Sequence, residues 1–179
     1  MSLNRSDEQV AALLAWAGRT RVSGSPRAAI VGVTAARLVI GVIFLMSGTL
    51  KEVLPSFHAN WVGMIRELGL PLQPVAIQLG AALEIAVGLL LLAGLLARLA
   101  AVGGLALMVG AAWIHLTVSS SALPTGLPPD WYPILTALAC ALVLRQGAGA
   151  WSLDRRRAIG AQPVPRDALS GTGSRATTG

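Results

Sequence analysis

The chain has 179 residues, of which 54% are hydrophobic and only 12% charged, and its formal net charge is +6. Soluble domains carry about 25% charged residues, so this composition excludes an ordinary soluble enzyme and predicts a small integral membrane protein. The basic excess does not indicate nucleic-acid binding, because the Lys and Arg residues are not interleaved with aromatic residues on one folded face.

Residues 1–27 precede the first long apolar stretch and are expected to form a separate segment outside the bilayer core. Apolar residues recur in it at the spacing of one helical face: Val10, Leu13, Leu14 and Ala17. Basic residues follow, so the pattern favours a short helix on the membrane surface with Trp16 near the lipid headgroups. A disordered basic tail with a helical bias is the alternative that the sequence leaves open.

Four apolar stretches within residues 28–154 predict an all-α fold, a four-helix transmembrane bundle. The first three are long enough to cross a bilayer, which requires about 20 residues. They cover residues 28–50, 74–96 and 99–118. The fourth begins near Trp131, and its clean apolar part ends at Leu144, which is short for a span. Three alternatives are open: the helix tilts little, it thins the bilayer, or it extends past Arg145 toward Trp151 with the arginine side chain reaching to the interface.

The connection between the first two spans, residues 51–73, also carries apolar residues at helical spacing: Phe57, Trp61, Met64, Ile65 and Leu68. We expect an amphipathic helix that rests on the outer surface of the bundle. The second and third spans are joined by a very short turn at Ala97 and Arg98, so they are expected to pack as an antiparallel hairpin.

The distribution of the 14 Lys and Arg residues predicts the orientation in the membrane. Eleven of them lie before the first span, in the turn between the second and third spans, or after the fourth span, whereas the other loops contain Lys51 and Arg66. Both termini are therefore predicted to be cytoplasmic. Residues 155–179 are rich in Arg, Gly, Ser, Thr and Pro, which predicts a disordered basic cytoplasmic tail. The positive charge also predicts attraction to anionic membrane lipids.

Few residues are available for metal, haem or thiol chemistry. Cys140 is the only cysteine and lies within the fourth span, so it is expected to be a packing residue rather than part of a thiol–disulfide relay. No spacing of Cys and His residues predicts a metal site. A bis-histidine haem would need His58, which lies in the first outward loop.

Polar residues inside the predicted spans are candidates for function, because polar groups are costly within a bilayer. They are Arg37 in the first span, Gln78 and Glu84 in the second, and His115 in the third. Helical rise places Arg37 roughly 5–6 Å below Glu84 and His115 roughly 6–7 Å above it. This spacing predicts a polar ladder, Arg37–Glu84–His115, with Gln78 at a depth similar to that of His115.

Glycines predict which side of the second span faces protein. Gly80, Glu84 and Gly88 recur every four residues, so they share one face on which small residues let a neighbouring helix approach. Gly41 and Gly48 provide a comparable stripe on the first span.

The polar ladder has two interpretations that the residues leave open. In the first, Arg37 and Glu84 neutralise each other and determine which helices touch. In the second, Glu84 or His115 exchanges protons with a lipid-soluble redox carrier or another small ligand. Because the sequence has no recognisable nucleophile, metal cluster or nucleotide motif, no residue is assigned as catalytic and an independent enzyme is not expected.

Several of these residues stand in motifs that resemble the DoxX family of small bacterial membrane proteins. Residues 37–51 have its pattern of an Arg, then Gly-x-x-Phe-Leu-x-x-Gly, then a Lys. Residues 84–101 are similar to its second helix and turn, residues 147–154 resemble its closing motif, and His115 falls where its third helix often has a histidine. The motif residues outside the ladder are Lys51, Arg98, Trp151 and Asp154.

The resemblance implies a four-helix protein of the bacterial inner membrane and is less specific about function. Family members include a subunit of a thiosulfate:quinone oxidoreductase and proteins associated with redox stress. The resemblance therefore implies a membrane subunit or scaffold of a complex associated with oxidative or thiol stress. The alternatives are a quinone-linked oxidoreductase subunit with a headgroup site at Arg37, Glu84 and His115, and a small transporter. The partners left open are cytoplasmic or membrane redox proteins and further copies of the chain.

Overall fold

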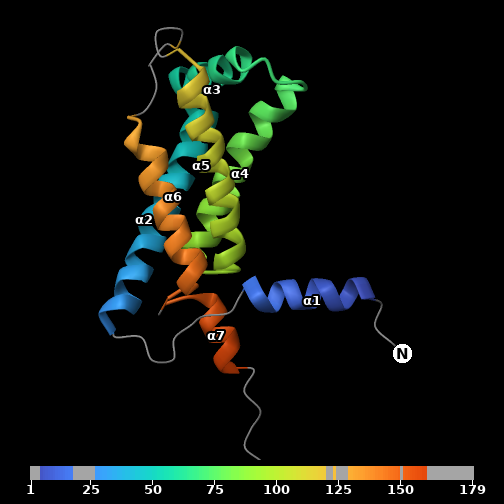
Figure 1. Cartoon of the computed structure of the whole chain (residues 1–179), viewed down its shortest axis with the longest axis vertical. Coiled ribbons are helices and arrows are strands. Elements are labelled where there is room, and N and C mark those ends of the chain that lie inside the picture. The colour runs from blue at the N-terminus through green and yellow to red at the C-terminus, as the bar shows by residue number, and fades with distance from the viewer. Residues whose placement is uncertain (1–4, 18–26, 120–122, 124–128, 150, 161–179) are drawn as a thin grey trace, which may run out of the picture.

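The computed structural model describes residues 5–17, 27–119, 123, 129–149 and 151–160, and all the regular structure in these residues is α-helical (Figure 1). The helices are α1 (Arg5–Ala17), α2 (Arg27–Val53), α3 (Pro55–Glu67), α4 (Gln73–Ala93), α5 (Ala97–Thr117), α6 (Trp131–Gln146) and α7 (Leu153–Gly160). The predicted all-α fold class is confirmed.

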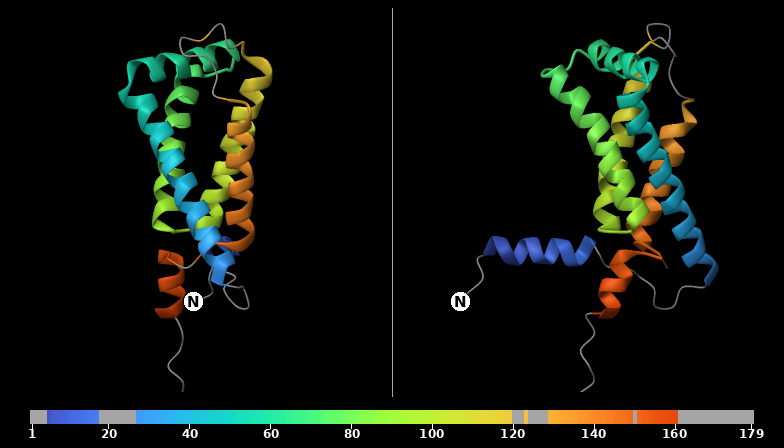
Figure 2. Two further views of the ribbon diagram at one scale, coloured as in Figure 1. Left: turned by 90° about the vertical axis from the view of Figure 1, so that its left-hand side faces the viewer. Right: turned by 180° about the vertical axis from the view of Figure 1, so that it is seen from behind.

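Helices α2, α4, α5 and α6 pack side by side as a bundle (Figures 1 and 2). The first three are long and apolar enough to cross a membrane, and α6 is a shorter apolar helix. Core residues from α2, α4 and α6 are almost completely buried: Ile40, Phe44, Leu91, Cys140 and Val143. Apolar side chains such as Val39 and Leu89 are exposed on the outer faces. Helices that are apolar on all sides are expected when lipid, rather than water, surrounds the bundle.

The fourth bundle helix is short. α6 has 16 residues, and at 1.5 Å per residue it is about 24 Å long, less than a hydrocarbon core of about 30 Å. It ends before Gly147, whose backbone leaves the helical region with φ 86° and ψ −161°. Of the alternatives left open for this span, continuation of the helix to Trp151 is wrong, because the chain turns at Gly147 and passes to the α4–α5 turn, where the Asp154 N–H binds the Gly94 carbonyl.

Glycines lie where α2 and α4 approach each other most closely. A Cβ atom added at Gly88 would lie 2.6 Å from the backbone nitrogen of Leu45, and one added at Gly48 would lie 2.8 Å from the carbonyl oxygen of Ala81. Both distances are too short for any side chain, so the two backbones meet at this separation only because glycine has no Cβ. Gly41 packs against Leu92 in the same interface.

Helix α3 lies across one end of the bundle rather than along it (Figure 2). Trp61 and Met64 of α3 pack against a small cluster formed by Ile114, Val118 and Leu123. The amphipathic helix expected in the first loop is confirmed.

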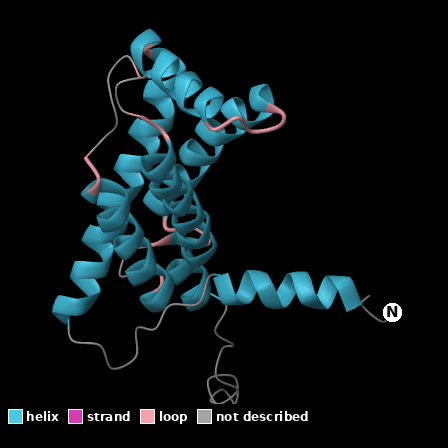
Figure 3. Cartoon of the chain, turned by 45° about the horizontal axis from the view of Figure 1, so that its top comes forward, coloured by secondary structure: helices cyan, strands magenta, loops and turns pink. Residues whose placement is uncertain are grey.

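Helices α1 and α7 lie at the opposite end of the bundle, and α1 extends sideways from it (Figures 1 and 3). Val10, Leu13 and Leu14 of α1 are exposed. Because α1 covers residues 5–17, the described part of the N-terminal segment is helical. α7 runs to Gly160, so the first residues of the expected disordered tail are helical too, and residues 161–179 lie outside the described residues.

Candidate functional site

Glu84, in the middle of α4, is only 7% exposed and forms an ion pair with Lys51 near the end of α2. The Lys51 Nζ donates a hydrogen bond to the Glu84 Oε1 over 2.5 Å. A lysine can reach a buried carboxylate in this way because its ammonium sits on a flexible four-carbon stem. The expected pairing of Glu84 with Arg37 is therefore wrong, and the carboxylate joins the opposite end of α2.

Helices α3 and α6 supply the surroundings of this ion pair. The ring centroid of Trp61, on α3, lies 4.4 Å from the Lys51 Nζ, which is a cation–π contact. Tyr132, on α6, shares a side-chain hydrogen bond with Ser47 and lies within electrostatic reach of Glu84. The second carboxylate oxygen, Oε2, is buried and has no hydrogen-bond partner among the described residues. Lys51 thus neutralises the carboxylate through one oxygen, whereas the other oxygen is left without a hydrogen bond among the described residues.

Arg37 is 1% exposed and binds backbone carbonyls at the α7 end of the bundle. Its Nη1 donates to the carbonyls of Leu91 and, over 3.0 Å, Leu92 at the end of α4. Its Nη2 donates to the carbonyl of Trp151 over 2.6 Å. The last carbonyls of a helix have no partner within the helix and carry partial negative charge. They offer Arg37 good acceptors, which explains why the guanidinium does not turn toward Glu84.

Asp154 caps the start of α5 from a distant part of the chain. Its carboxylate accepts hydrogen bonds from the N–H groups of Leu96, over 2.9 Å, and Ala97, over 3.0 Å. These amides lie at a helix N-terminus, where they have no helical acceptor and where negative charge is favoured. Asp154 is also within electrostatic reach of Arg37. Arg37, Gly94, Trp151 and Asp154 thus form one cluster, here called the α7-end cluster, that joins α2, the α4–α5 turn and the segment after α6.

His115 and Gln78 lie toward the α3 end and do not complete the expected ladder. The His115 Nδ1 lies 2.8 Å from the Oδ1 of Asp130, which is exposed. Gln78 is exposed on α4. Arg37, Glu84 and His115 therefore have three separate sets of partners, and any role of these residues in binding a ligand stays a prediction.

Comparisons with known proteins identify the family. A family model described as DoxX matches residues 32–117, which run from α2 to the end of α5. Over 151 residues the chain is 34% identical to an uncharacterised membrane protein of Mycobacterium tuberculosis, covering 79% of this chain and 87% of that protein. The chain belongs to the DoxX family. No solved structure matches it.

The motif residues of this DoxX-family protein lie where separate helices are joined. Lys51 binds Glu84, whereas the Trp151 carbonyl and the Asp154 carboxylate belong to the α7-end cluster. Arg98 is buried at the start of α5, and its guanidinium lies 5.9 Å from the centroid of the Trp16 ring of α1. Lys51 is the partner of Glu84 that sequence reasoning missed. The available signal was the charge of Lys51 in the last turn of a span that faces the same glycine stripe.

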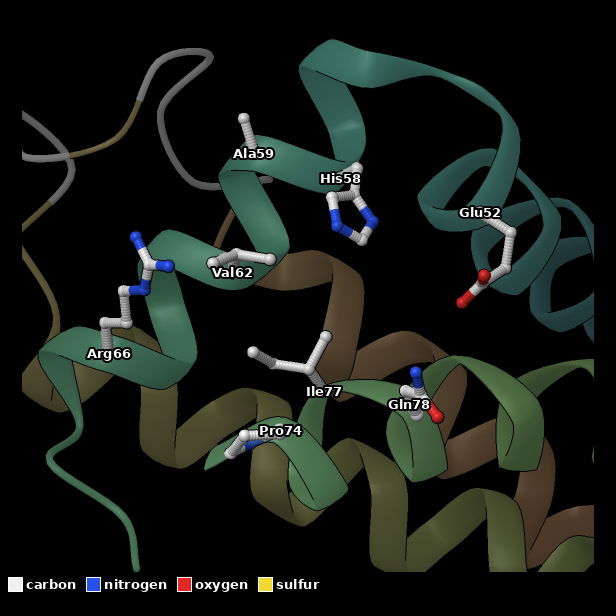
Figure 4. Close-up of a pocket in the computed structure, with 8 residues that line it drawn as sticks. All are labelled: Glu52, His58, Ala59, Val62, Arg66, Pro74, Ile77 and Gln78. Atoms are coloured by element: carbon white, nitrogen blue, oxygen red, sulfur yellow. The ribbon is translucent and has the colours of Figure 1, made fainter. Parts of the chain in front are cut away.

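The DoxX-family chain also has a groove of about 500 Å³ between α3 and the first turns of α4 (Figure 4). Its lining is polar at Glu52, His58, Arg66 and Gln78, and apolar at Ala59, Val62, Pro74 and Ile77. Only Gln78 was expected from the sequence to carry function. The signal that could have located the groove is the four-residue spacing of His58, Val62 and Arg66, which places them on one face of α3.

Proposed function

We propose that this DoxX-family protein is a membrane subunit or scaffold of a redox-associated complex in a bacterial inner membrane, with both termini cytoplasmic. The observation that carries the proposal is the bonding of Arg37, whose donors go to backbone carbonyls of α4 and of the segment after α6. Both terminal nitrogens of the guanidinium are used in this way, whereas its Nε is buried without a hydrogen-bond partner among the described residues. A substrate that takes the place of these carbonyls would break contacts that hold the helices. The redox association itself rests on the family resemblance.

Buried charges that hold helices together suit a rigid anchor. Removing one partner of a buried ion pair costs about 3–5 kcal/mol, because it leaves an uncompensated charge in an apolar interior. Lys51–Glu84 joins α2 to α4, and the α7-end cluster joins α2, the α4–α5 turn and the segment after α6. In this proposal the bundle is the anchor, and the helices at its α7 end are the parts that a partner meets.

A cytoplasmic redox protein is the proposed partner, and α1 and α7 are the proposed contact elements. Both helices lie at the same end of the bundle (Figure 1), where the distribution of Lys and Arg predicts the cytoplasm. Arg156 of α7 is exposed, so it is available to an acidic surface.

Purification in mild detergent followed by mass spectrometry of the co-purifying proteins tests this proposal. The wild type is compared with Arg156→Glu, and with Glu67→Gln as a matched surface control, because Glu67 is exposed at the α3 end. We expect redox proteins with the wild type and with the control, and loss of them with Arg156→Glu. The same partners with all three chains would rule out docking through α7, and partners unrelated to redox chemistry would rule out the redox association.

A quinone-linked role is the second candidate, and one observation favours it. The Oε2 of Glu84 is buried without a hydrogen-bond partner among the described residues, and the Tyr132 side chain lies nearby. In this candidate Glu84 would accept a proton from a quinol headgroup that enters beside it. Arg37 and His115 would take no part, because each binds groups elsewhere.

Extraction of quinones from the purified protein tests this candidate. We expect bound quinone in the wild type and its loss in Glu84→Gln, with Thr49→Ser as a control at an exposed position on α2. Thermal unfolding of each chain separates loss of a ligand from loss of the fold. Wild-type protein that is folded and free of quinone after purification in a quinone-containing membrane would exclude the site.

A further inference from the structure

The groove between α3 and α4 has opposite charges at its two ends. Figure 4 shows Arg66 at one end and Glu52 at the other, with His58 and Gln78 nearer to Glu52. Neither Arg66 nor Glu52 forms an ion pair among the residues that the structure describes, and both side chains are exposed. A groove with a free cation at one end and a free anion at the other is complementary to a ligand that carries both charges.

His58 adds a hydrogen-bond acceptor to the anionic end. Its Nδ1 lies 2.9 Å from the backbone carbonyl oxygen of Lys51. A carbonyl oxygen can only accept, so Nδ1 must carry the proton in this hydrogen bond. When the ring carries this one proton, its Nε2 is an acceptor. Together with the Glu52 carboxylate and the Gln78 side-chain oxygen, it can accept hydrogen bonds from a ligand that has several N–H groups.

The position of the groove indicates a lipid as the source of that ligand. It lies at the end of the bundle where α2 ends and α4 begins, which is where membrane-spanning helices pass through the headgroup layer. Apolar residues alternate with the polar ones in its lining, so it can also contact the first carbons of a glycerol backbone or acyl chain. Its volume of about 500 Å³ lies within the range of small-molecule sites.

We propose that this groove binds a phospholipid with a phosphoethanolamine headgroup. The phosphate binds Arg66, whose planar guanidinium can contact two phosphate oxygens at once. The primary ammonium binds Glu52 and the acceptors of His58 and Gln78. A primary ammonium has three N–H donors, whereas a trimethylammonium group has none, so the groove discriminates against a phosphocholine headgroup. An anionic headgroup without an ammonium leaves Glu52 unpaired and is also disfavoured. This inference is independent of the proposed function.

Competition between lipids tests the proposal. The protein is reconstituted in nanodiscs that contain equal amounts of phosphatidylethanolamine, phosphatidylcholine and phosphatidylglycerol, and the lipid retained after release into detergent is measured by native mass spectrometry. We expect the wild type to retain phosphatidylethanolamine several-fold over the other two. Equal retention of the three lipids by the folded wild type would overturn the proposal.

Two substitutions, each of which removes one charge, distinguish the ends of the groove. Glu52→Gln removes the carboxylate that binds the lipid ammonium, so the lipid preference of this variant should shift several-fold toward phosphatidylglycerol. Arg66→Gln removes the phosphate partner and should lower retention of all three lipids. Glu67→Gln, on α3 but outside the lining of the groove, is the matched control and should behave like the wild type. All three positions are exposed, and thermal unfolding checks that each chain is folded. An unchanged lipid preference in Glu52→Gln, or displacement of the lipid by soluble phosphoethanolamine at equal concentration, would overturn the lipid assignment.

Discussion

The Lys51 Nζ lies 2.5 Å from the Glu84 Oε1, so a lysine near the end of α2 neutralises a carboxylate in the middle of α4. Both side chains are largely withdrawn from the surface, at 15% exposure for Lys51 and 9% for Glu84. The Glu84 carboxylate is the more buried of the two charges, and a charge with so little access to water depends on its partner. The pair therefore makes each residue dependent on the other for stability.

Breaking this pair on one side should destabilise the protein. Glu84→Leu leaves the Lys51 ammonium without its carboxylate, and Lys51→Met does the reverse. Lys51→Met leaves the more buried charge and is expected to cost up to about 3–5 kcal/mol, the range for a buried ion pair that loses one member, and Glu84→Leu should cost less because Lys51 is partly exposed. Thermal unfolding in detergent, followed by the yield of monodisperse protein in size-exclusion chromatography, measures the effect.

Combining the two substitutions should recover much of the loss, because no unpaired charge remains. The combination of Arg37→Leu with Glu84→Leu is the decisive comparison, since Arg37 and Glu84 have separate partners. It should be at least as unstable as the worse single variant. Recovery with Arg37→Leu rather than with Lys51→Met would contradict the observed pairing.

Arg37→Lys should be destabilising even though it conserves the charge. The guanidinium reaches carbonyls at the end of α4 and in the segment after α6 with two different nitrogens. An ammonium is a single point donor without this fork, so it cannot serve both groups in the same geometry. We expect a loss of about 2 kcal/mol or more in the free energy of unfolding, since hydrogen bonds to charged groups contribute about 1.5–3 kcal/mol each. Urea or thermal unfolding that matches the wild type would show that these contacts contribute little.

Glycine substitutions test the close approach of α2 and α4. Gly88→Ala places a methyl group against the backbone of Leu45, and backbone atoms within a helix cannot move aside. The free energy of unfolding should fall by about 1–3 kcal/mol, as it does when a core is overpacked. Gly110→Ala is the matched control, because a Cβ at Gly110 meets nothing within 4 Å. That control should be neutral or stabilise by about 0.5–1 kcal/mol through helix propensity. Equal melting temperatures for the two variants would mean that the helices are not held at this separation.

Removing the α5 cap should weaken the α4–α5 turn. Asp154→Ala deletes the carboxylate that accepts from the Leu96 and Ala97 amides, and a lost N-terminal cap costs about 0.5–2 kcal/mol. Asp154→Asn keeps one acceptor oxygen and should lose less. Hydrogen exchange at the first amides of α5 reports the change locally, and unaltered protection in Asp154→Ala would argue against the cap.

Much of this fold can be predicted from the sequence, because a helix that crosses a bilayer must be apolar over about 20 residues. Runs of apolar residues located the three long spans, and helical spacing between Phe57 and Leu68 indicated α3 before any contact was known. The end of α6 was less predictable. Its apolar pattern fades gradually toward Arg145, and the stop at Gly147 depends on a turn that brings Asp154 to the start of α5.

Partner choice among the buried charges was not predictable from depth alone. Rise along a helix gives the height of Arg37 and Glu84 but not the competing acceptors around them. For Arg37 these are carbonyls in the last turn of α4, and for Glu84 the partner is a long, flexible lysine. The groove was hidden for a related reason, since His58 and Arg66 become neighbours of Gln78 only when α3 folds back over α4.

By itself the sequence determined that this chain is a membrane-embedded α-helical bundle with motifs resembling those of the DoxX family. An uninterrupted apolar run long enough to cross a bilayer must satisfy its backbone hydrogen bonds within itself, and an α-helix does so. Only the tertiary structure decided which charge meets which. Hydrogen bonds act over about 3 Å, and the positions of side chains at that scale follow from how the helices cross, not from where residues stand in the chain.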